Sequence, residues 1–230
     1  MTSGTAFVRY LAFLLLPVLA ACTPRAAERP AEFGQAATQP VQIQLDAAEL
    51  QRVQGISVGT EGAPVVIYEF ADFACPGCAQ FAAVVTPHVK QRYVEQGHVR
   101  FVHYDFPLLS IHPTAFLAAR AGRCAHEQDR FWEYHDVLYA QQRGWAAEQD
   151  PAATFVEYAG QVGIDRQRFE ACLRSDRYAE EVTRNLRLGE ALGVPGTPTL
   201  FINGRRIEIR SLEDLDRQIQ EEIRAAGGSG

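Results

Sequence analysis

Hydrophobic residues predict a central β-strand in the first half of the chain. The segment Val65–Phe70 is apolar at nearly every position, as in a strand that helices cover on both faces. The next segment, Phe81–Tyr93, has the apolar spacing of a helix, and we expect a kink at Pro87 within it. Val99–Phe106 predicts a second strand, with Gly97 in the turn before it.

The region from about Pro113 to Leu192 carries no strand pattern. Amphipathic or alanine-rich stretches follow one another there and predict helices over 113–126, 131–140, 151–161, 166–173 and 177–192. Two short strands, 199–203 and 206–209, flank Gly204 as a predicted hairpin. Leu212–Ala226 then predicts a closing amphipathic helix. This order of elements predicts an α/β fold with a helical insertion.

The first 22 residues predict an export signal. Arg9 precedes the apolar run Tyr10–Ala20, which has the length of a signal-peptide core and is too short to span a bilayer. The run ends in Leu19-Ala20-Ala21-Cys22, which resembles the bacterial lipobox. We therefore expect residues 1–21 to be removed and Cys22 to carry lipid as the mature N-terminus. The alternative is an ordinary signal peptide, which leaves Cys22 as a free thiol.

Residues 22–45 are expected to form a tether between the lipid and a folded domain over 46–226. Thr23 to about Pro40 is rich in Ala, Pro, Glu and Gln and offers almost nothing apolar to bury, so it predicts disorder. Residues 227–230 are expected to form a flexible tail. No stretch after the signal is apolar enough to span a membrane.

The charge balance excludes one class of function. The chain has a net charge of −6, which becomes −7 once residues 1–21 are removed, because that segment holds Arg9 and no acidic residue. Without a basic run, the chain is not expected to bind nucleic acid. Five cysteines less Cys22 leave an even number in an exported protein, so we expect two pairs, Cys75 with Cys78 and Cys124 with Cys172. Two buried free thiols are the alternative for the second pair.

The sequence Cys75-Pro76-Gly77-Cys78 directly follows a predicted strand and opens a predicted helix. Proline suits the first helical turn, where its missing N–H is not needed. The free N–H groups and the dipole at a helix N-terminus stabilise an anion, so they favour the thiolate of Cys75. We therefore expect Cys75 to attack disulfides and Cys78, one turn later, to resolve the mixed disulfide.

Further motifs accompany the two cysteines in a set order. They are Glu69-Phe70-Ala-Asp-Phe-Ala-Cys-Pro-Gly-Cys78, Phe106-Pro107, His112-Pro113, Cys124-Ala125, Phe131-Trp132, Phe169-Glu-Ala-Cys172-Leu173, Gly193-Val-Pro-Gly-Thr-Pro-Thr199 and Ile202-Asn203-Gly204. With this series the chain resembles, over roughly residues 60–225, the DsbA-like branch of the thioredoxin superfamily. The resemblance implies a thioredoxin fold with an inserted all-helical subdomain at about 107–192, and an activity in thiol–disulfide exchange.

The resemblance also assigns roles near the cysteines. It implies that Pro198 is a cis-proline facing them and that Thr197, Pro76 and Gly77 contact an extended substrate segment. It implies further that Glu69 is a buried acid with a raised pKa that exchanges a proton with the second cysteine. The alternative for Glu69 is a solvated strand end.

The direction of electron flow is less constrained by the sequence. The best-known oxidants of this branch carry Pro-His between their cysteines, whereas this chain has Gly77, which offers no side-chain donor to the thiolate. We expect a dithiol oxidase of exported proteins, anchored by lipid at a membrane and facing the periplasm or cell exterior. It should work with a membrane or soluble redox partner and without cofactor or metal. The alternative is a reductase of exported thiols.

Two other classes of function have weaker support. A thioredoxin-fold module could bind a soft metal through Cys75 and Cys78, although no further Cys or Met pair lies nearby in the sequence. Gly55-Ile-Ser57-Val-Gly59 matches the nucleophile elbow of serine hydrolases, which must join a strand to a helix. The histidines show no metal-binding spacing.

Overall fold

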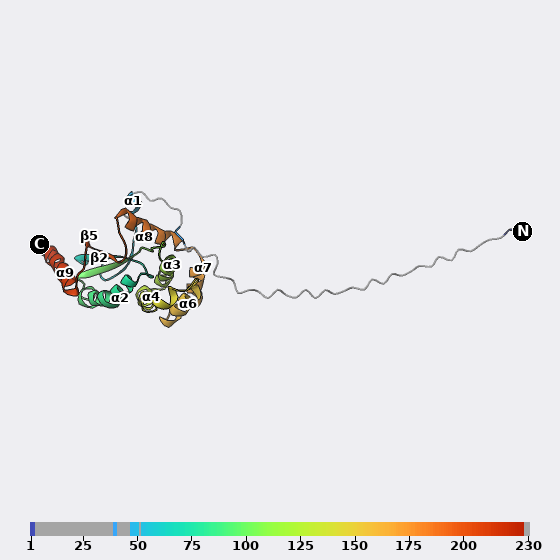
Figure 1. Cartoon of the computed structure of the whole chain (residues 1–230), viewed down its shortest axis with the longest axis horizontal. Helices are drawn as coiled ribbons and strands as arrows, with labels where there is room; N and C mark the ends of the chain where they lie inside the picture. Colours follow the sequence, from blue (N-terminus) through green and yellow to red (C-terminus); the bar gives the residue numbers. More distant parts are fainter. Residues whose placement is uncertain (3–38, 41–46, 51, 228–230) are drawn as a thin grey trace. The chain divides into compact units, whose positions relative to one another are not determined.

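The structure is a computed structural model of the 230-residue chain, and it describes residues 1–2, 39–40, 47–50 and 52–227. All the helices and strands described belong to one compact unit within residues 33–230 (Figure 1). The predicted signal peptide over 1–21, Cys22 and most of the predicted tether lie outside the described residues.

A five-stranded sheet lies at the centre of this unit. Its order is β1-β3-β2-β4-β5, formed by β1 (Ile56–Val58), β2 (Val65–Ala71), β3 (Val99–Asp105), β4 (Thr199–Ile202) and β5 (Arg205–Ile207). The two long strands β2 and β3 run parallel, and the other pairings are antiparallel. Their many β-branched and aromatic residues favour strands in a covered sheet. The fold is thus α/β, as predicted.

Helices account for most of the remaining described residues. They are α1 (Ala47–Leu50), α2 (Pro76–Val89), α3 (Ala115–His126), α4 (Phe131–Ala140), α5 (Gln142–Trp145), α6 (Ala152–Gln161), α7 (Arg166–Arg174), α8 (Ala179–Ala191) and α9 (Leu212–Gly227). A π-helical stretch, Lys90–Val94, continues α2. Among the described residues, no helix combines the length and hydrophobicity that crossing a bilayer requires.

The sheet is covered on both faces, which explains why its strands are apolar throughout. On one face, Ile67 and Phe101 pack with Ile219, so that α2 and α9 cover this side. On the other face, Phe70 and Tyr104 stack with ring centroids 5.0 Å apart, beneath residues of α8. Figure 1 shows α8 on the opposite side of the sheet from α2 and α9.

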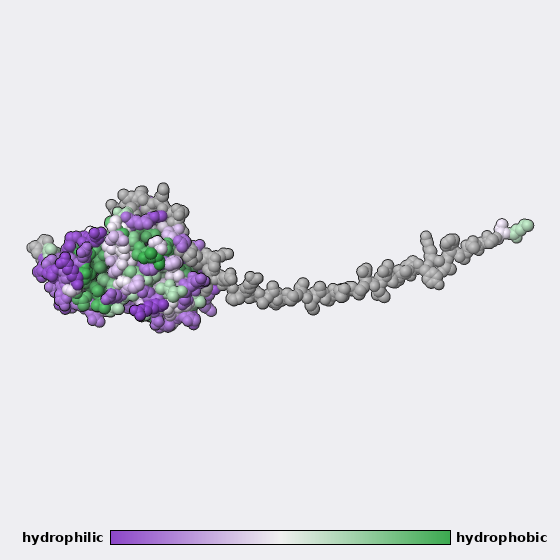
Figure 2. All heavy atoms as spheres, in the orientation of Figure 1, coloured by the Kyte–Doolittle hydropathy of each residue, from purple (hydrophilic) through white to green (hydrophobic). Residues whose placement is uncertain are grey.

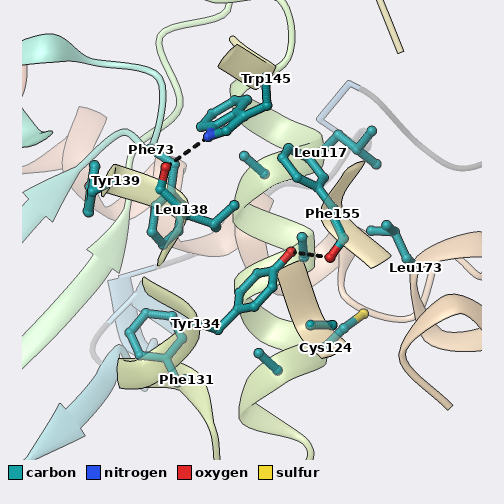
Figure 3. Close-up of a cluster of buried hydrophobic side chains, with 14 of the residues drawn as sticks. Phe73, Leu117, Cys124, Phe131, Tyr134, Leu138, Tyr139, Trp145, Phe155 and Leu173 are labelled. Carbon is teal, nitrogen blue, oxygen red and sulfur yellow. Dashed lines mark hydrogen bonds between the residues drawn. The ribbon is translucent and has the colours of Figure 1, made fainter. Parts of the chain in front are cut away.

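The helices between β3 and β4 form a subdomain with its own core. Figure 3 shows Phe73, Tyr134, Leu138 and Phe155 among the side chains that converge there. The Tyr134 hydroxyl donates to the Phe155 carbonyl at 3.0 Å, so the buried ring brings no unpaired polar group into the core. A disulfide joins Cys124 on α3 to Cys172 on α7, with their Cα atoms 5.8 Å apart.

The structure differs from the predicted elements at several points. Ser57 lies in β1, which pairs with β3 and leads into a loop, so the serine-hydrolase interpretation is wrong. Neither β1 nor α5 was expected, because three or four residues are too short to show a period. Helix α2 continues past Pro87, and the π-helical stretch begins three residues later. Helix α9 includes Gly227, the first residue of the predicted tail.

Candidate active site

Cys75 occupies the N-cap of α2 with extended backbone angles, φ −77° and ψ 122°, and Pro76 begins the helix. This placement directs the free backbone N–H groups of the first turn towards the cysteine sulfur. The pKa of Cys75 is lowered to about 5, mainly by a hydrogen bond from the Cys78 thiol, and the backbone N–H groups of Gly77 and Cys78 contribute. At neutral pH the Cys75 side chain is therefore a thiolate.

Cys78 behaves in the opposite way. Its side chain is fully buried, and burial, the neighbouring Cys75 and the carboxyl of Glu69 all raise its pKa. The pair is thus one thiolate near the surface and one thiol beneath it. Such asymmetry suits a nucleophile and a resolving cysteine.

The segment Thr197–Pro198 lies against the cysteine motif from the other side. The peptide bond between these two residues is cis, and the Cys75 thiol group lies 3.3 Å from the Thr197 carbonyl oxygen. A Cβ atom on Gly77 would stand 3.4 Å from Cδ of Pro198. The structure therefore brings Pro76, Gly77, Thr197 and Pro198 together around the Cys75 sulfur, as the resemblance implied.

A groove of about 710 Å³ begins beside these residues. Its lining includes Gly77, Phe81, Val84, Val85, Pro198, Leu200 and Leu212. Val84 is half exposed there, although it is an apolar residue of α2. Figure 2 shows hydrophobic surface over α2, beside the hydrophilic surface of α9. The lining also includes polar residues, among them Gln80, Arg206 and Glu208. A groove with an apolar wall next to a nucleophile can hold a segment of a polypeptide substrate.

Glu69 lies in β2 beneath the cysteines and is almost fully buried, with 1% of its surface exposed. The interpretation of this residue as a solvated strand end is therefore wrong. Burial raises its pKa to about 8, and the charge of Cys75 adds to this effect. Neither carboxyl oxygen has a hydrogen-bond partner within the described residues. The charge of Glu69 acts on the Cys78 thiol, so a protonated Glu69 can donate a proton to Cys78 or, once ionised, accept one from it.

Two histidines complete a buried polar cluster around Glu69. His103 comes from β3 and His135 from α4, and neither is exposed to solvent. One nitrogen of each ring and one oxygen of Glu69 all lie within 4.8 Å of one another. In the described part of the chain this is the one group close enough to share a metal ion. The Glu69 oxygens, both His103 nitrogens and Nε2 of His135 have no hydrogen-bond partner among the described residues, and a neutral Glu69 with a raised pKa is suited to proton exchange within this cluster.

Two buried residues that the sequence analysis missed hold the loop before Cys75. Asp72 accepts hydrogen bonds from the backbone N–H groups of Ala74 at 2.7 Å and Leu108 at 2.8 Å, and it pairs with His112 at 2.8 Å. Gln142, in α5, donates to the carbonyl oxygen of Cys75 at 2.9 Å. The sequence could have identified Asp72, because it is an acidic residue within the apolar run before Cys75.

A thiolate at a helix N-terminus, a buried thiol one turn later and a cis-proline opposite them, in an α/β fold with a helical insertion, make up a site whose chemistry suits thiol–disulfide exchange. A sequence model described as Thioredoxin matches residues 51–221, well over half of the chain. The chain therefore belongs to the thioredoxin family.

Individual proteins are similar to the same region. The probable disulfide bond formation protein D of Bacillus cereus is 28% identical over 174 residues, covering 73% of this chain and 78% of that protein. The Na(+)/H(+) antiporter NhaA 3 of Salinispora tropica is 35% identical over 176 residues, covering 74% of this chain. The matched region spans only 26% of the length of this antiporter and 21% of the length of the Na(+)/H(+) antiporter NhaA 1 of Salinispora arenicola.

Solved structures share the fold. Oxidised BdbD from Bacillus subtilis superposes with a TM-score of 0.67 at 22% sequence identity, covering 74% of this chain and 96% of that one. Oxidised DsbA from Mtb gives a TM-score of 0.62 at 24% identity, covering 76% of this chain. The predicted fold and class are confirmed by these comparisons and by the family match.

Proposed function

We propose that the chain oxidises pairs of thiols in exported proteins, with Cys75 and Cys78 as the redox pair. The observation that carries the proposal is the asymmetry of the two cysteines, because stabilising the Cys75 thiolate stabilises the reduced form. A protein whose reduced form is favoured passes its disulfide readily to other thiols.

The exchange follows in two steps. A client thiolate attacks the Cys75 sulfur, the bond between Cys75 and Cys78 breaks, and its electron pair stays on Cys78, which takes a proton from Glu69. A second client thiolate then attacks the client sulfur of the mixed disulfide and releases Cys75 as a thiolate. Two electrons pass from the client dithiol to the protein, and the client is left with a disulfide.

Residues around the pair support binding of an extended client segment. The carbonyl oxygen of Thr197 lies 3.3 Å from the Cys75 sulfur, at the edge where Pro198 and Gly77 meet. Backbone pairing at this edge places a client sulfur beside Cys75, and the groove lined by Phe81 and Val84 accepts apolar side chains that flank it. Because these contacts involve the client backbone and apolar side chains, the site should accept clients of many sequences and not one specific substrate.

We also propose that the chain works outside the cytoplasm as a lipoprotein. Support comes from the sequence pattern of residues 1–21 followed by Cys22. Residues 22–45 then serve as a tether to the membrane for the domain over 46–226. A separate redox partner of the disulfide class must restore the Cys75–Cys78 disulfide after each turnover.

The experiment that tests this function is redox equilibration of the purified domain with glutathione, read by alkylation and mass analysis. We expect Cys75 to be alkylated at mildly acidic pH well before Cys78. At equilibrium with the same glutathione buffer, a larger fraction of this domain than of thioredoxin should be in the dithiol form. The disulfide form should oxidise a reduced two-cysteine peptide, and Cys75→Ser and Cys78→Ser should not. A disulfide as stable as that of thioredoxin would indicate a reductase, and a stoichiometric metal on the two cysteines a binding module.

A further inference from the structure

The buried position of Cys78 leaves the path of its proton unexplained. Each time the disulfide forms, one proton must leave the Cys78 thiol, and each time it breaks, one must return. Cys78 is fully buried and Glu69 is 1% exposed, so neither exchanges protons with water directly. Glu69 can hold one proton, but a repeated cycle needs a connection from Glu69 to solvent.

His135 has the contacts that such a connection requires. Its Nδ1 lies 2.8 Å from Oδ1 of Asp136, whose side chain is 58% exposed. Because a carboxylate accepts hydrogen bonds, Nδ1 carries the hydrogen and Nε2 carries the lone pair. Nε2 is buried and has no hydrogen-bond partner within the described residues, and a nitrogen of this ring lies within 4.8 Å of Glu69. A small rotation of the Glu69 carboxyl or one bridging water spans that distance.

His103 also faces Glu69 but does not lead to solvent. Its Nδ1 lies 4.0 Å from Oε2 of Glu69, and its Nε2 lies 3.5 Å from Oδ1 of Asp105. Asp105 is fully buried and accepts a hydrogen bond from Nε of Arg123 at 2.7 Å. A guanidinium does not release its proton at physiological pH, so this branch ends there. Arg123 also pairs with the exposed Glu181 at 2.9 Å, but its guanidinium blocks proton transfer to that acid, so the branch through His135 is the one whose groups can carry a proton to an exposed acid.

The charge state of His135 suits transfer of a proton and not its storage. Burial lowers the pKa of the ring to about 4, against the opposing effect of Asp136. The ring is therefore neutral at neutral pH and keeps a free lone pair. The titratable groups around it are Glu69 on β2, His103 on β3, Lys90 in the π-helical stretch, and Asp136 and Tyr139 on its own helix.

We propose that His135 and Asp136 relay protons between Glu69 and solvent, a proposal that rests on the proposed exchange at Cys75 and Cys78. When the disulfide forms, Glu69 passes its proton to Nε2 of His135 and takes the proton of Cys78. His135 then releases its Nδ1 proton to Asp136, which passes it to water. The net result is one proton moved from Cys78 to solvent, with Glu69 returned to its starting state.

The opposite half-reaction reverses this transfer. When a client thiolate breaks the disulfide, Glu69 protonates Cys78 and recovers a proton from Nε2 of His135, and Nδ1 takes one from Asp136 or water. The two half-reactions thus alternate between the two tautomers of His135. The present structure has free thiols at Cys75 and Cys78, and its Nδ1–H tautomer is the one expected after reduction.

The relay is tested by the rate at which oxidised glutathione converts the reduced full-length protein to its disulfide, measured by rapid quenching and alkylation. We expect Asp136→Asn and His135→Phe to slow closure of the mixed disulfide by roughly 100-fold or more. The phenyl ring keeps the contacts of His135 with Tyr139 and Trp132, whose ring centroids lie 4.8 and 5.2 Å away. The equilibrium constant with glutathione and the alkylation rate of Cys75 should not change.

Matched variants distinguish the loss of proton transfer from the loss of side-chain packing around His135. Glu133→Gln makes the same charge change on the same helix, at an acid whose side chain is 48% exposed, and should leave the rate unchanged. His103→Phe removes an equally buried ring and should slow closure much less than His135→Phe. In His135→Ala, imidazole should restore the rate, whereas pyrazole, a ring of similar size and far weaker basicity, should not.

Each contrary result has a definite meaning. Unchanged closure in Asp136→Asn and His135→Phe, equal slowing in His103→Phe, or equal rescue by pyrazole would overturn the relay. So would a stoichiometric metal in the purified protein that is lost in His135→Ala. If the wild-type protein does not exchange with glutathione at all, the proposed function fails instead.

Discussion

Replacing Gly77 by His should make the protein a stronger oxidant. A Cβ atom at this position meets Cδ of Pro198 at 3.4 Å and the Cys75 sulfur at 3.6 Å, both ordinary contact distances. Residue 77 lies in the first turn of α2, where a side chain is accommodated in a regular helix. The imidazole of a histidine there can therefore reach the Cys75 thiolate without displacing the backbone.

The size of the effect follows from the new hydrogen bond. A donor to a charged group contributes roughly 1.5–3 kcal/mol, which for a two-electron couple raises the reduction potential by about 30–65 mV. The bond forms with the thiolate and not with the disulfide, so it stabilises the reduced state selectively. The pKa of Cys75, about 5 in the wild-type protein, should fall further.

The assay is equilibration with glutathione at fixed pH, together with the pH dependence of Cys75 alkylation. Gly77→Ala is the control, since it adds the same Cβ without a donor and should leave the potential close to that of the wild type. The reasoning is refuted if Gly77→His leaves the potential and the pKa of Cys75 unchanged, or if Gly77→Ala raises the potential as much as Gly77→His does.

Three further predictions follow from buried or bonded groups. The pKa of Glu69 is about 8 in the folded chain and 4.5 in the unfolded chain, so between pH 4.5 and 8 the folded state holds one more proton than the unfolded state. The contribution of Glu69 to the free energy of unfolding should then fall by up to ~1.4 kcal/mol per pH unit from pH 4.5 to 8, while Cys75, whose pKa is lowered from 9.0 to about 5, contributes in the opposite direction. Denaturant titrations should therefore show Glu69→Gln gaining stability relative to the wild type as the pH rises over this range. Replacing Cys124 and Cys172 by Ala opens a loop of sequence separation 48 and should cost about 4 kcal/mol in the same titrations, without altering exchange at the active site. Cys22→Ser should release the protein from membranes in cell fractionation, and an unlipidated wild-type N-terminus in mass spectra would contradict the lipoprotein proposal.

The parts of the site that the sequence predicted are those set by local structure. Cys75 and Cys78 follow a strand and open a helix, so their spacing alone defines which sulfur lies at the helix N-terminus. Glu69 stands out because its neighbours in the strand are apolar, and a strand covered on both faces leaves it no exposed position.

The other parts depend on contacts between distant segments. His103 on β3 and His135 on α4 are 32 residues apart, and they meet only because the helical subdomain packs against the sheet beside Glu69. Gln142 reaches the Cys75 carbonyl from α5, a helix of four residues that leaves no periodic signal. Asp72 follows the strand directly, but only the fold shows that the backbone of Leu108 and the ring of His112 converge on it.

The buried acid Glu69 and the Cys75 thiolate place one further constraint on the redox chemistry. Two negative charges on Glu69 and Cys75 would repel each other in a low-dielectric site, and this repulsion would destabilise the reduced form relative to the disulfide. The raised pKa of Glu69 avoids that outcome, because the carboxyl stays neutral while Cys75 is ionised. Proton exchange with solvent through His135 lets Glu69 return to this neutral state after each half-reaction. The same residue can therefore serve Cys78 as a proton carrier without weakening the oxidising power that the Cys75 thiolate provides.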